Sequence, residues 1–189
     1  SDLTLDGAVG TLGNLVKGGQ DPTRWTALFT PGSNITDAAN MIAIASGSFT
    51  DLSGNPGAGG QSAVFAIDTA APTTTSFQLS AASLAAGQSA TLAITFSEAV
   101  TGLALSDFSF NAALGTLDNL QQVSGTNQWT AIYTAAAGAP SSSNNTISLV
   151  AGSYADEAGN GGAARVSSPF AVVGAAPAAN MIYGTVAGD

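Results

Sequence analysis

The sequence contains no cysteine and no histidine, and only 3 of its residues are lysine or arginine. Without cysteine there is no disulfide framework and no thiolate site. Without histidine there is no imidazole ligand, and the Ser-His-Asp and Cys-His catalytic arrangements are excluded. Nucleic acids and anionic membrane surfaces are poor candidate partners, because binding phosphate groups requires many basic side chains. Because both cysteine and histidine are absent, a metal ion must be bound by oxygen ligands, which favours hard cations such as Ca²⁺ or Mg²⁺.

Long apolar runs are also absent, since no stretch approaches the roughly 18–20 apolar residues that cross a bilayer as a helix. The 189 residues are nevertheless 45% hydrophobic, which is ample for a buried core. The 12 acidic residues outnumber the basic ones and give a net charge of −9, so a cation is the natural binding partner. The chain starts at Ser1 without a methionine or a signal peptide, and we expect it to be part of a longer polypeptide.

A long internal repeat divides the chain. The stretch GTLGNL from Gly10 returns as GTLDNL from Gly115, 105 positions later, and Trp25 returns as Trp129. A repeat of this length has the size of one β-sandwich and is too long for a solenoid unit. We predict an all-β chain of tandem Greek-key β-sandwiches. The first, over residues 1–68, is incomplete and lacks its first two strands, A and B.

The second sandwich, residues 69–173, is predicted to be complete, and residues 174–189 form a tail or the start of a following domain. Alternating apolar and polar residues between Gly, Ser, Asn and Pro clusters predict seven short strands. The strands A to G are expected at Thr74–Leu79, Ala90–Phe96, Asp107–Asn111, Thr116–Gln122, Gln128–Thr134, Thr146–Ala151 and Ala164–Val172. No amphipathic helix is predicted. We expect four aromatic residues to pack in the cores: Trp25, Trp129, Tyr133 and Phe110.

Four motifs occur in order at sandwich spacing. They are D-T-x-x-P (Asp68–Pro72), F-S-E-x-V-x-G (Phe96–Gly102), S-D-F (Ser106–Phe108) and D-x-A-G-N (Asp156–Asn160). Together they make the chain resemble the bacterial immunoglobulin-like (Ig-like) domain that repeats in large secreted adhesins and biofilm-associated surface proteins of Gram-negative bacteria. The resemblance implies tandem Ig-like sandwiches in a stalk outside the cell, often stiffened by calcium at the domain junctions. Val173 replaces the linker aspartate after the second copy, which departs from the pattern.

The topology predicts where the acidic loops meet. In an Ig-like Greek key, the B–C and F–G loops lie at the pole where strand A begins. The residues expected to bind Ca²⁺ at that pole of the second sandwich are Asp68, Glu98, Asp107, Asp156 and Asn160. The corresponding residues of the first copy are Asp2, Asp51 and Asn55, and the preceding domain could add Asn34 or Asp37. Carboxylates, an amide and backbone carbonyls supply the six to eight oxygens that Ca²⁺ takes. The alternative is that D-x-x-G-N forms only a turn, in which Asp accepts hydrogen bonds from the backbone.

The sequence therefore predicts a non-catalytic, calcium-stiffened structural or interaction module from an adhesin stalk. Its expected partners are neighbouring Ig-like repeats and an unidentified surface ligand. A carbohydrate- or surface-binding sandwich is an alternative, which an exposed Trp25 or Trp129 would favour. Weaker alternatives are a glycosidase using carboxylates such as the Asp156-Glu157 pair or Glu98 and an ice-binding face at the Thr74-Thr75 run. The missing strands A and B also allow a strand-exchanging, filament-forming subunit, with Asn180–Asp189 as a donor strand.

Overall fold

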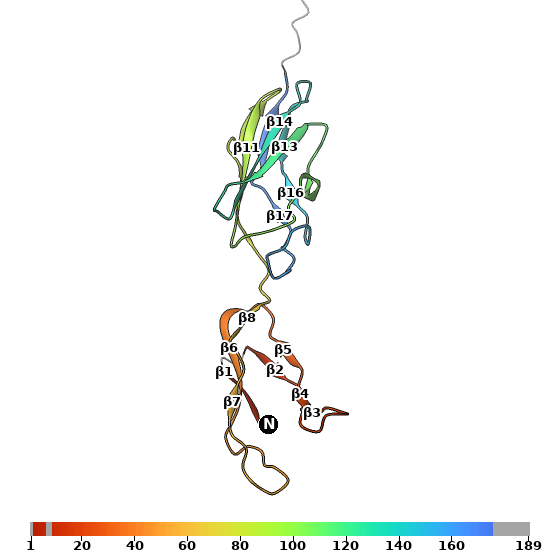
Figure 1. Cartoon of the computed structure of the whole chain (residues 1–189). Helices are drawn as coiled ribbons and strands as arrows, with labels where there is room; N and C mark the ends of the chain where they lie inside the picture. Colours follow the sequence, from red (N-terminus) through yellow and green to blue (C-terminus); the bar gives the residue numbers. More distant parts are fainter. Residues whose placement is uncertain (1, 7–8, 176–189) are drawn as a thin grey trace, which may run out of the picture. The chain divides into compact units, whose positions relative to one another are not determined.

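The structure is a computed structural model that describes residues 2–6 and 9–175 (Figure 1). The chain forms two compact units: unit 1 comprises Ser1–Ala71 and Ala158–Asn160, and unit 2 comprises Pro72–Glu157 and Gly161–Asp189. The described residues form strands, turns and one short 3₁₀ helix, which confirms the all-β prediction. No helix among them has the length and apolar character needed to cross a membrane. The predicted donor strand Asn180–Asp189 lies outside the described residues.

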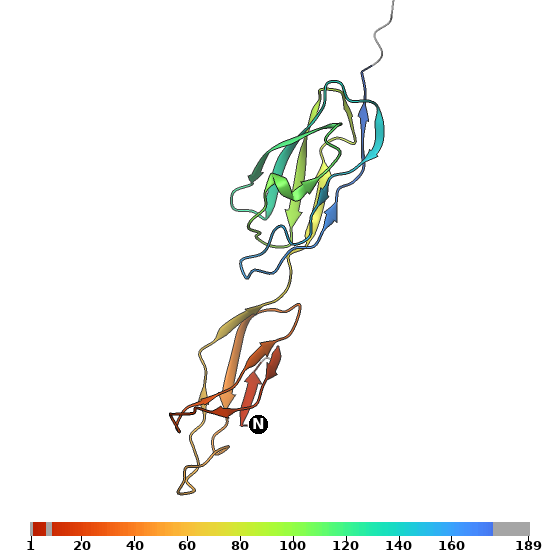
Figure 2. The same cartoon turned by 90° about the vertical axis from the view of Figure 1, so that its right-hand side faces the viewer.

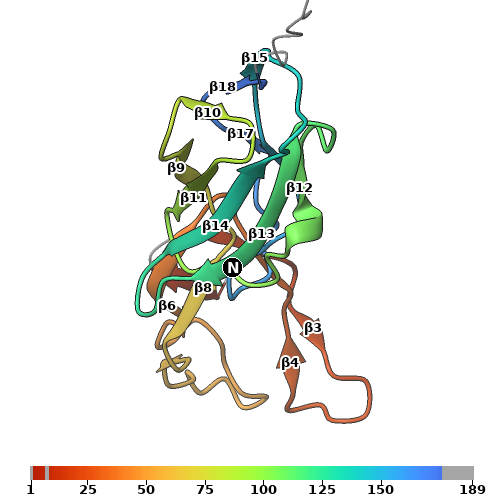
Figure 3. The same cartoon turned by 90° about the horizontal axis from the view of Figure 1, so that it is seen from above.

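Unit 2 is a sandwich of two layers, in which all strand pairs but one are antiparallel among the described residues (Figure 2). One sheet has the strand order β13-β14-β11-β9, and Figure 3 shows these four strands side by side. The opposite layer is built from two short sheets, β12-β16-β17 and β10-β18-β15. The strands are β9 (Thr74–Leu79), β10 (Ser83–Ala85), β11 (Ser89–Phe96), β12 (Phe108–Ser109), β13 (Gly115–Gln122), β14 (Gln128–Ala135), β15 (Ser142–Asn145), β16 (Ser148–Leu149), β17 (Arg165–Val166) and β18 (Phe170–Val173), with the 3₁₀ helix η1 (Leu105–Asp107) before β12.

This strand order is the predicted Greek key, with strands A, B, E and D in one sheet and C, F and G in the other. Predicted strands A, B, D and E match β9, β11, β13 and β14 to within one residue at each end. These strands were predicted well because one face of their sheet is buried and the other faces solvent. Apolar and polar residues therefore alternate along each strand.

The opposite layer was predicted less well. The predicted strand Asp107–Asn111 shortens to β12, because Asp107 completes the 3₁₀ helix. The predicted strand Thr146–Ala151 is only β16, and β15 precedes it as a separate strand. Strand β10 was not predicted, because it pairs in parallel with β18, some 88 positions away at Ser83 and Ala171. Such a pairing leaves no periodic pattern in so short a segment.

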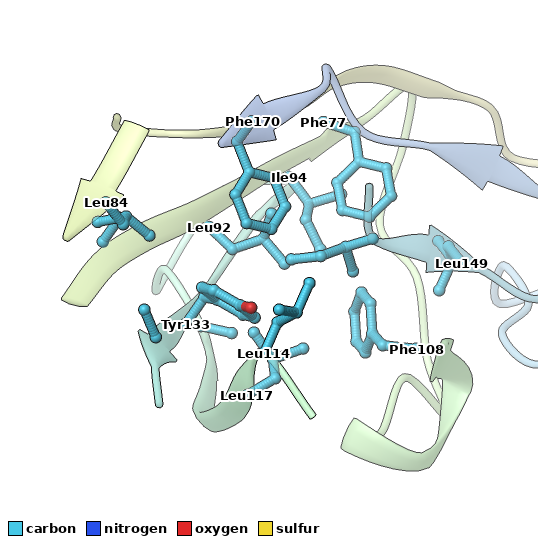
Figure 4. Packing of buried hydrophobic residues seen from close by; sticks show 14 of the residues in the cluster. Phe77, Leu84, Leu92, Ile94, Phe108, Leu114, Leu117, Tyr133, Leu149 and Phe170 are labelled. Carbon is cyan, nitrogen blue, oxygen red and sulfur yellow. The ribbon is translucent and has the colours of Figure 1, made fainter. Parts of the chain in front are cut away.

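The core of unit 2 lies between the two layers (Figure 4). Leu92 and Ile94 of β11 are fully buried there. Tyr133 of β14 is also buried and meets the Phe170 ring edge-on at 5.1 Å between ring centroids. Phe110 and Trp129 pack against the same cluster. The prediction that Tyr133, Phe110 and Trp129 are core residues is therefore confirmed.

Unit 1 has the strands of a sandwich from C onward. They are β1 (Leu3–Asp6), β2 (Gly10–Leu12), β3 (Val16–Lys17), β4 (Trp25–Thr26), β5 (Phe29–Pro31), β6 (Thr36–Ile44), β7 (Gly60–Gln61) and β8 (Phe65–Asp68). Strand β6 pairs with β1, β7 and β8, while β2 pairs with β5 and β3 with β4. Among the described residues, nothing in this unit corresponds to β9 or β11. The predicted absence of strands A and B from the first sandwich is confirmed.

The prediction that Trp25 is a core residue is wrong, because this side chain is 55% exposed. Its counterpart Trp129 lies opposite Ile94 of β11 in the strand register. Within the described part of unit 1, no strand lies at the corresponding edge of β4. The tryptophan is thus exposed because the strand that would cover it is missing.

We expect Ile94→Ala to lower the free energy of unfolding of unit 2 by about 2–5 kcal/mol, since it removes a fully buried side chain and leaves a cavity. Urea unfolding followed by circular dichroism measures this loss. Val166→Ala, at a side chain that is 54% exposed, is the matched control and should change stability by less than about 0.5 kcal/mol. Equal effects of the two substitutions would contradict the assigned core.

Candidate cation site

The F–G loop of unit 2 closes between Gly152 and Gly162. The Gly152 N–H donates to the Gly162 carbonyl at 2.8 Å, and the Gly162 N–H donates to the Tyr154 carbonyl at 2.8 Å. The buried Tyr154 ring lies against Gly162, where an added Cβ atom would come within 2.0 Å of the ring. Gly159 has a φ of +91°, a conformation that glycine adopts at little cost. The glycines of the motif are therefore required by the loop's own geometry.

This loop is fixed to the B–C loop next to its aspartate. The Thr101 N–H donates to the Ala155 carbonyl at 2.7 Å, and the Ala155 N–H donates back to the Thr101 carbonyl at 3.2 Å. Asp156 directly follows Ala155, and Glu98 precedes Thr101 by three residues. The backbone pair thus brings two acidic residues together that are 58 positions apart in sequence.

Carboxylate oxygens of Glu98 and Asp156 lie within 4.8 Å of each other. Asp156 is almost completely buried, with 3% of its surface exposed, and Glu98 is half-buried. Two carboxylates this close repel each other, and a cation bound between them offsets the repulsion. Partial burial strengthens the effect because water screens the charges less. This pair is an arrangement of oxygen ligands suited to a hard cation.

Asn160 and Asp68 meet in unit 1. The Asn160 side-chain amide donates to the Asp68 backbone carbonyl at 3.2 Å. The Asp68 carboxylate accepts hydrogen bonds from the Thr36 hydroxyl and from the Ala70 N–H, each at 3.2 Å. Asp68 therefore ends strand β8 in a defined orientation, directly before the segment that leads to Pro72.

Asp107, which was also predicted to be a ligand, has a local structural role. Its carboxylate accepts a hydrogen bond from the Ala104 N–H at 2.7 Å and so caps the 3₁₀ helix η1. It is not one of the acidic side chains that gather with Glu98 and Asp156 in the described part of the chain. Its counterpart Asp2 is exposed and lines a hollow of unit 1 beside Trp25.

The corresponding loop of unit 1 forms a self-contained turn. The Asp51 carboxylate accepts hydrogen bonds from the Asn55 side-chain amide at 2.8 Å, the Asn55 N–H at 2.9 Å and the Ser53 N–H at 2.8 Å. These bonds, with that from the Asn55 side chain the strongest, lower the pKa of Asp51. Among the described residues of unit 1, none corresponds to the B–C loop that carries Glu98 in unit 2. Here the alternative of a hydrogen-bonded turn describes the structure.

The other candidate ligands in unit 1 also have local roles. The Asp37 carboxylate accepts a hydrogen bond from the Ala39 N–H at 3.0 Å, and Asn34 is an exposed turn residue with a φ of 58°. Two residues that position the acidic groups were missed by sequence reasoning, namely Thr36 and Thr101. No sequence signal marks them, because Thr101 acts chiefly through its backbone and Thr36 through a strand pairing with Asp68.

The family model of the bacterial Ig-like domain matches residues 1–67 and again residues 68–172. The chain belongs to this family. A search of curated proteins found no match. Among solved structures, the chain is similar to FdeC, described as a broadly conserved Escherichia coli adhesin eliciting protection against urinary tract infections. The identity is 15% and the TM-score 0.40, over 93% of this chain and 52% of that one, so the chain spans about half of that structure.

The two Ig-like domains therefore carry the same F–G loop with different surroundings. In the first Ig-like domain, Asp51 is exposed and its hydrogen-bond partners belong to its own loop. In the second, Asp156 is buried close to another carboxylate.

We expect the Asp51 carboxyl group to titrate below its usual pKa of 3.8, and Asn55→Ala to move the midpoint back toward that value. Because the pKa of Asp51 is lower in the folded state than in the unfolded state, the ionised carboxylate stabilises the fold. This stabilisation is complete above the unfolded-state pKa. It is lost as pH falls through the lower folded-state value. Side-chain NMR titration measures both midpoints.

Asp21 serves as the internal control for this titration. Its pKa is also lowered, but by hydrogen bonds from the Thr23 hydroxyl and the Thr23 N–H. Asn55→Ala should leave the Asp21 midpoint unchanged. An Asp51 midpoint that does not respond to Asn55→Ala would contradict the proposed cause.

Proposed function

We propose that the chain is a structural module of a bacterial surface adhesin in which a bound Ca²⁺ ion stiffens the joint between two Ig-like domains. The observation that supports this proposal is the close Glu98–Asp156 carboxylate pair, one member of which is buried. A cation between two such carboxylates offsets their mutual repulsion. The pair lies where backbone hydrogen bonds between Thr101 and Ala155 join the B–C and F–G loops.

We propose Asp68, which ends strand β8 directly before the segment that leads into unit 2, as a third ligand of the ion. Three carboxylates leave three to five positions for water and backbone carbonyls in the usual calcium shell of six to eight oxygens. Calcium accepts irregular ligand geometry, whereas Mg²⁺ requires a near-octahedral shell. Ligands from irregular loops and a strand end therefore favour Ca²⁺.

The mechanical consequence follows from the position of Asp68. Only Thr69, Ala70 and Ala71 separate it from Pro72, where unit 2 begins. A free linker between domains allows relative motion, whereas an ion that binds residues from both sides of it restrains the joint. Millimolar calcium outside cells suits sites of moderate affinity in extracellular modules. We propose neighbouring Ig-like repeats and a surface ligand as partners, a location at the bacterial surface, and no catalytic activity.

Carbohydrate binding is a second candidate function, because Trp25 is 55% exposed beside Asp2 and Thr23. Exposed tryptophans offer flat faces on which sugar rings stack. The counterpart Trp129 is packed, however, and Trp25 is exposed because no described strand covers it. We therefore prefer the structural module.

We expect Ca²⁺ to bind the chain and to raise the melting temperature of unit 2 by about 10 °C at a concentration about 100-fold above Kd, where binding contributes about 2.7 kcal/mol. Asp156→Asn and Glu98→Gln should abolish most of this rise, because each removes a ligand charge. Titration and differential scanning calorimetry with and without EDTA give both quantities.

Asp51→Asn is the matched control, since it alters the same loop motif in the domain that has no counterpart of Glu98. It should leave calcium binding and the calcium-induced rise unchanged. If Ca²⁺ neither binds nor shifts the melting temperature of the unsubstituted chain, the proposal is wrong.

Stiffening can be measured separately from binding. Because the chain has no cysteine, Val64→Cys in unit 1 and Val166→Cys in unit 2, both exposed sites, can be spin-labelled cleanly. We expect the distance distribution between the labels to narrow when Ca²⁺ is added and to remain broad in Asp68→Asn. A distribution that calcium leaves unchanged would refute stiffening even if the ion binds.

A further inference from the structure

Two short motifs, one in each unit, share the pattern N-x-T. They are Asn34-Ile35-Thr36 in unit 1 and Asn144-Asn145-Thr146 in unit 2. An asparagine followed two positions later by serine or threonine, with a residue other than proline between them, is the acceptor pattern for N-linked glycosylation. No other asparagine of the chain is followed by serine or threonine at this spacing. The pattern requires a surface position, which the sequence alone does not show.

Both acceptor asparagines lie at the surface in turns. Their side chains are exposed, and their backbones adopt the left-handed conformation, with a φ of 58° at Asn34 and 59° at Asn144. Asparagine is one of the few residues besides glycine that adopts this conformation readily. Asn34 lies in the connection between β5 and β6, and Asn144 lies in β15 shortly before β16. A modifying enzyme can therefore reach each side chain while its unit stays folded.

The fold does not use the side-chain amides of these two residues. Those of Asn34 and Asn144 form no hydrogen bond with any described residue. The neighbouring Asn145, by contrast, is half-buried, and its amide donates to the Ser142 carbonyl at 3.1 Å and to the Phe170 carbonyl at 3.2 Å. A sugar on Asn145 would break both bonds, whereas a sugar on Asn144 breaks none and leaves no buried group without a partner.

We propose that Asn34 and Asn144 are acceptors for N-linked glycosylation, with a hexose carried by a nucleoside diphosphate as the sugar donor. The asparagine Nδ2 atom forms a bond to C1 of the hexose while the bond between C1 and the phosphate oxygen breaks. The nucleoside diphosphate leaves with the electron pair of that bond, and Nδ2 gives one proton to a base of the transferase. Thr36 and Thr146 complete the acceptor pattern that the transferase recognises.

Asn119 provides a control within the same chain. It is exposed as well, and its φ of 54° is also left-handed. Two positions later stands Gln121, whose side-chain amide donates to the Asn119 Oδ1 atom at 2.6 Å. Asn119 thus has the exposure and the backbone of the two acceptors but lacks the threonine. We expect it to stay unmodified.

The test treats the whole folded chain, purified without sugars attached, with a soluble bacterial N-glycosyltransferase and a nucleoside diphosphate hexose. We expect two added hexoses by intact-mass spectrometry, and peptide mapping should assign them to Asn34 and Asn144. Asn34→Gln and Asn144→Gln should each remove one hexose, and the double substitution should remove both. Thr146→Ala keeps the asparagine but breaks the pattern, so it should also remove the hexose from Asn144.

Gln121→Thr is the matched variant that creates a site, because it completes the N-x-T pattern at an exposed, left-handed asparagine. It should add a third hexose, at Asn119. The proposal is overturned if the folded chain accepts no hexose or accepts it only after unfolding in urea. It is equally overturned if the hexoses persist in the double Asn→Gln variant or if Gln121→Thr gains none.

Discussion

The structure depends on one constraint: a sheet with an apolar face must be covered by a second layer. In unit 2, β11 meets this constraint because it lies between β14 and β9 and buries Leu92 and Ile94 completely. Apolar burial of this kind is the main favourable term in folding. The burial of Tyr154 beneath Phe96, at the end of β11, follows from it. In unit 1 the same loops and ring pairs exist, but among its described residues the corresponding cover is absent and its tryptophan is exposed.

The repeat shows that a sequence motif does not determine a site by itself. The same D-x-x-G-N segment forms an exposed, self-satisfied turn at Asp51 and a buried carboxylate near another at Asp156. The difference is the B–C loop, which supplies Glu98 only in the second Ig-like domain. The surroundings of each aspartate, and not the motif, decide what its carboxylate can do: accept hydrogen bonds within a turn or be available as a ligand for an ion.

In the repeated loop, an aromatic ring packs directly against a glycine, so each of the two residues requires the other. At Gly57 and at Gly162, an added Cβ atom would fall about 2 Å from the ring of Phe49 or Tyr154, respectively. The aromatic residue and the glycine are thus one packing unit that recurs in both domains. The loop geometry is retained in unit 1 even though Phe49 is not covered there, so local backbone requirements maintain it independently of the core.

The sequence by itself determined the elements whose signal is local. Strands β9, β11, β13 and β14 alternate along their length, and the absence of cysteine and histidine restricts any metal site to oxygen ligands. Only the tertiary structure decided what depends on distant neighbours. It shows the parallel pairing of β10 with β18, the use of Asp107 as a helix cap and the exposure of Trp25. Each of these depends on which segment lies alongside, and contacts between segments far apart in the chain leave no periodic trace in either one.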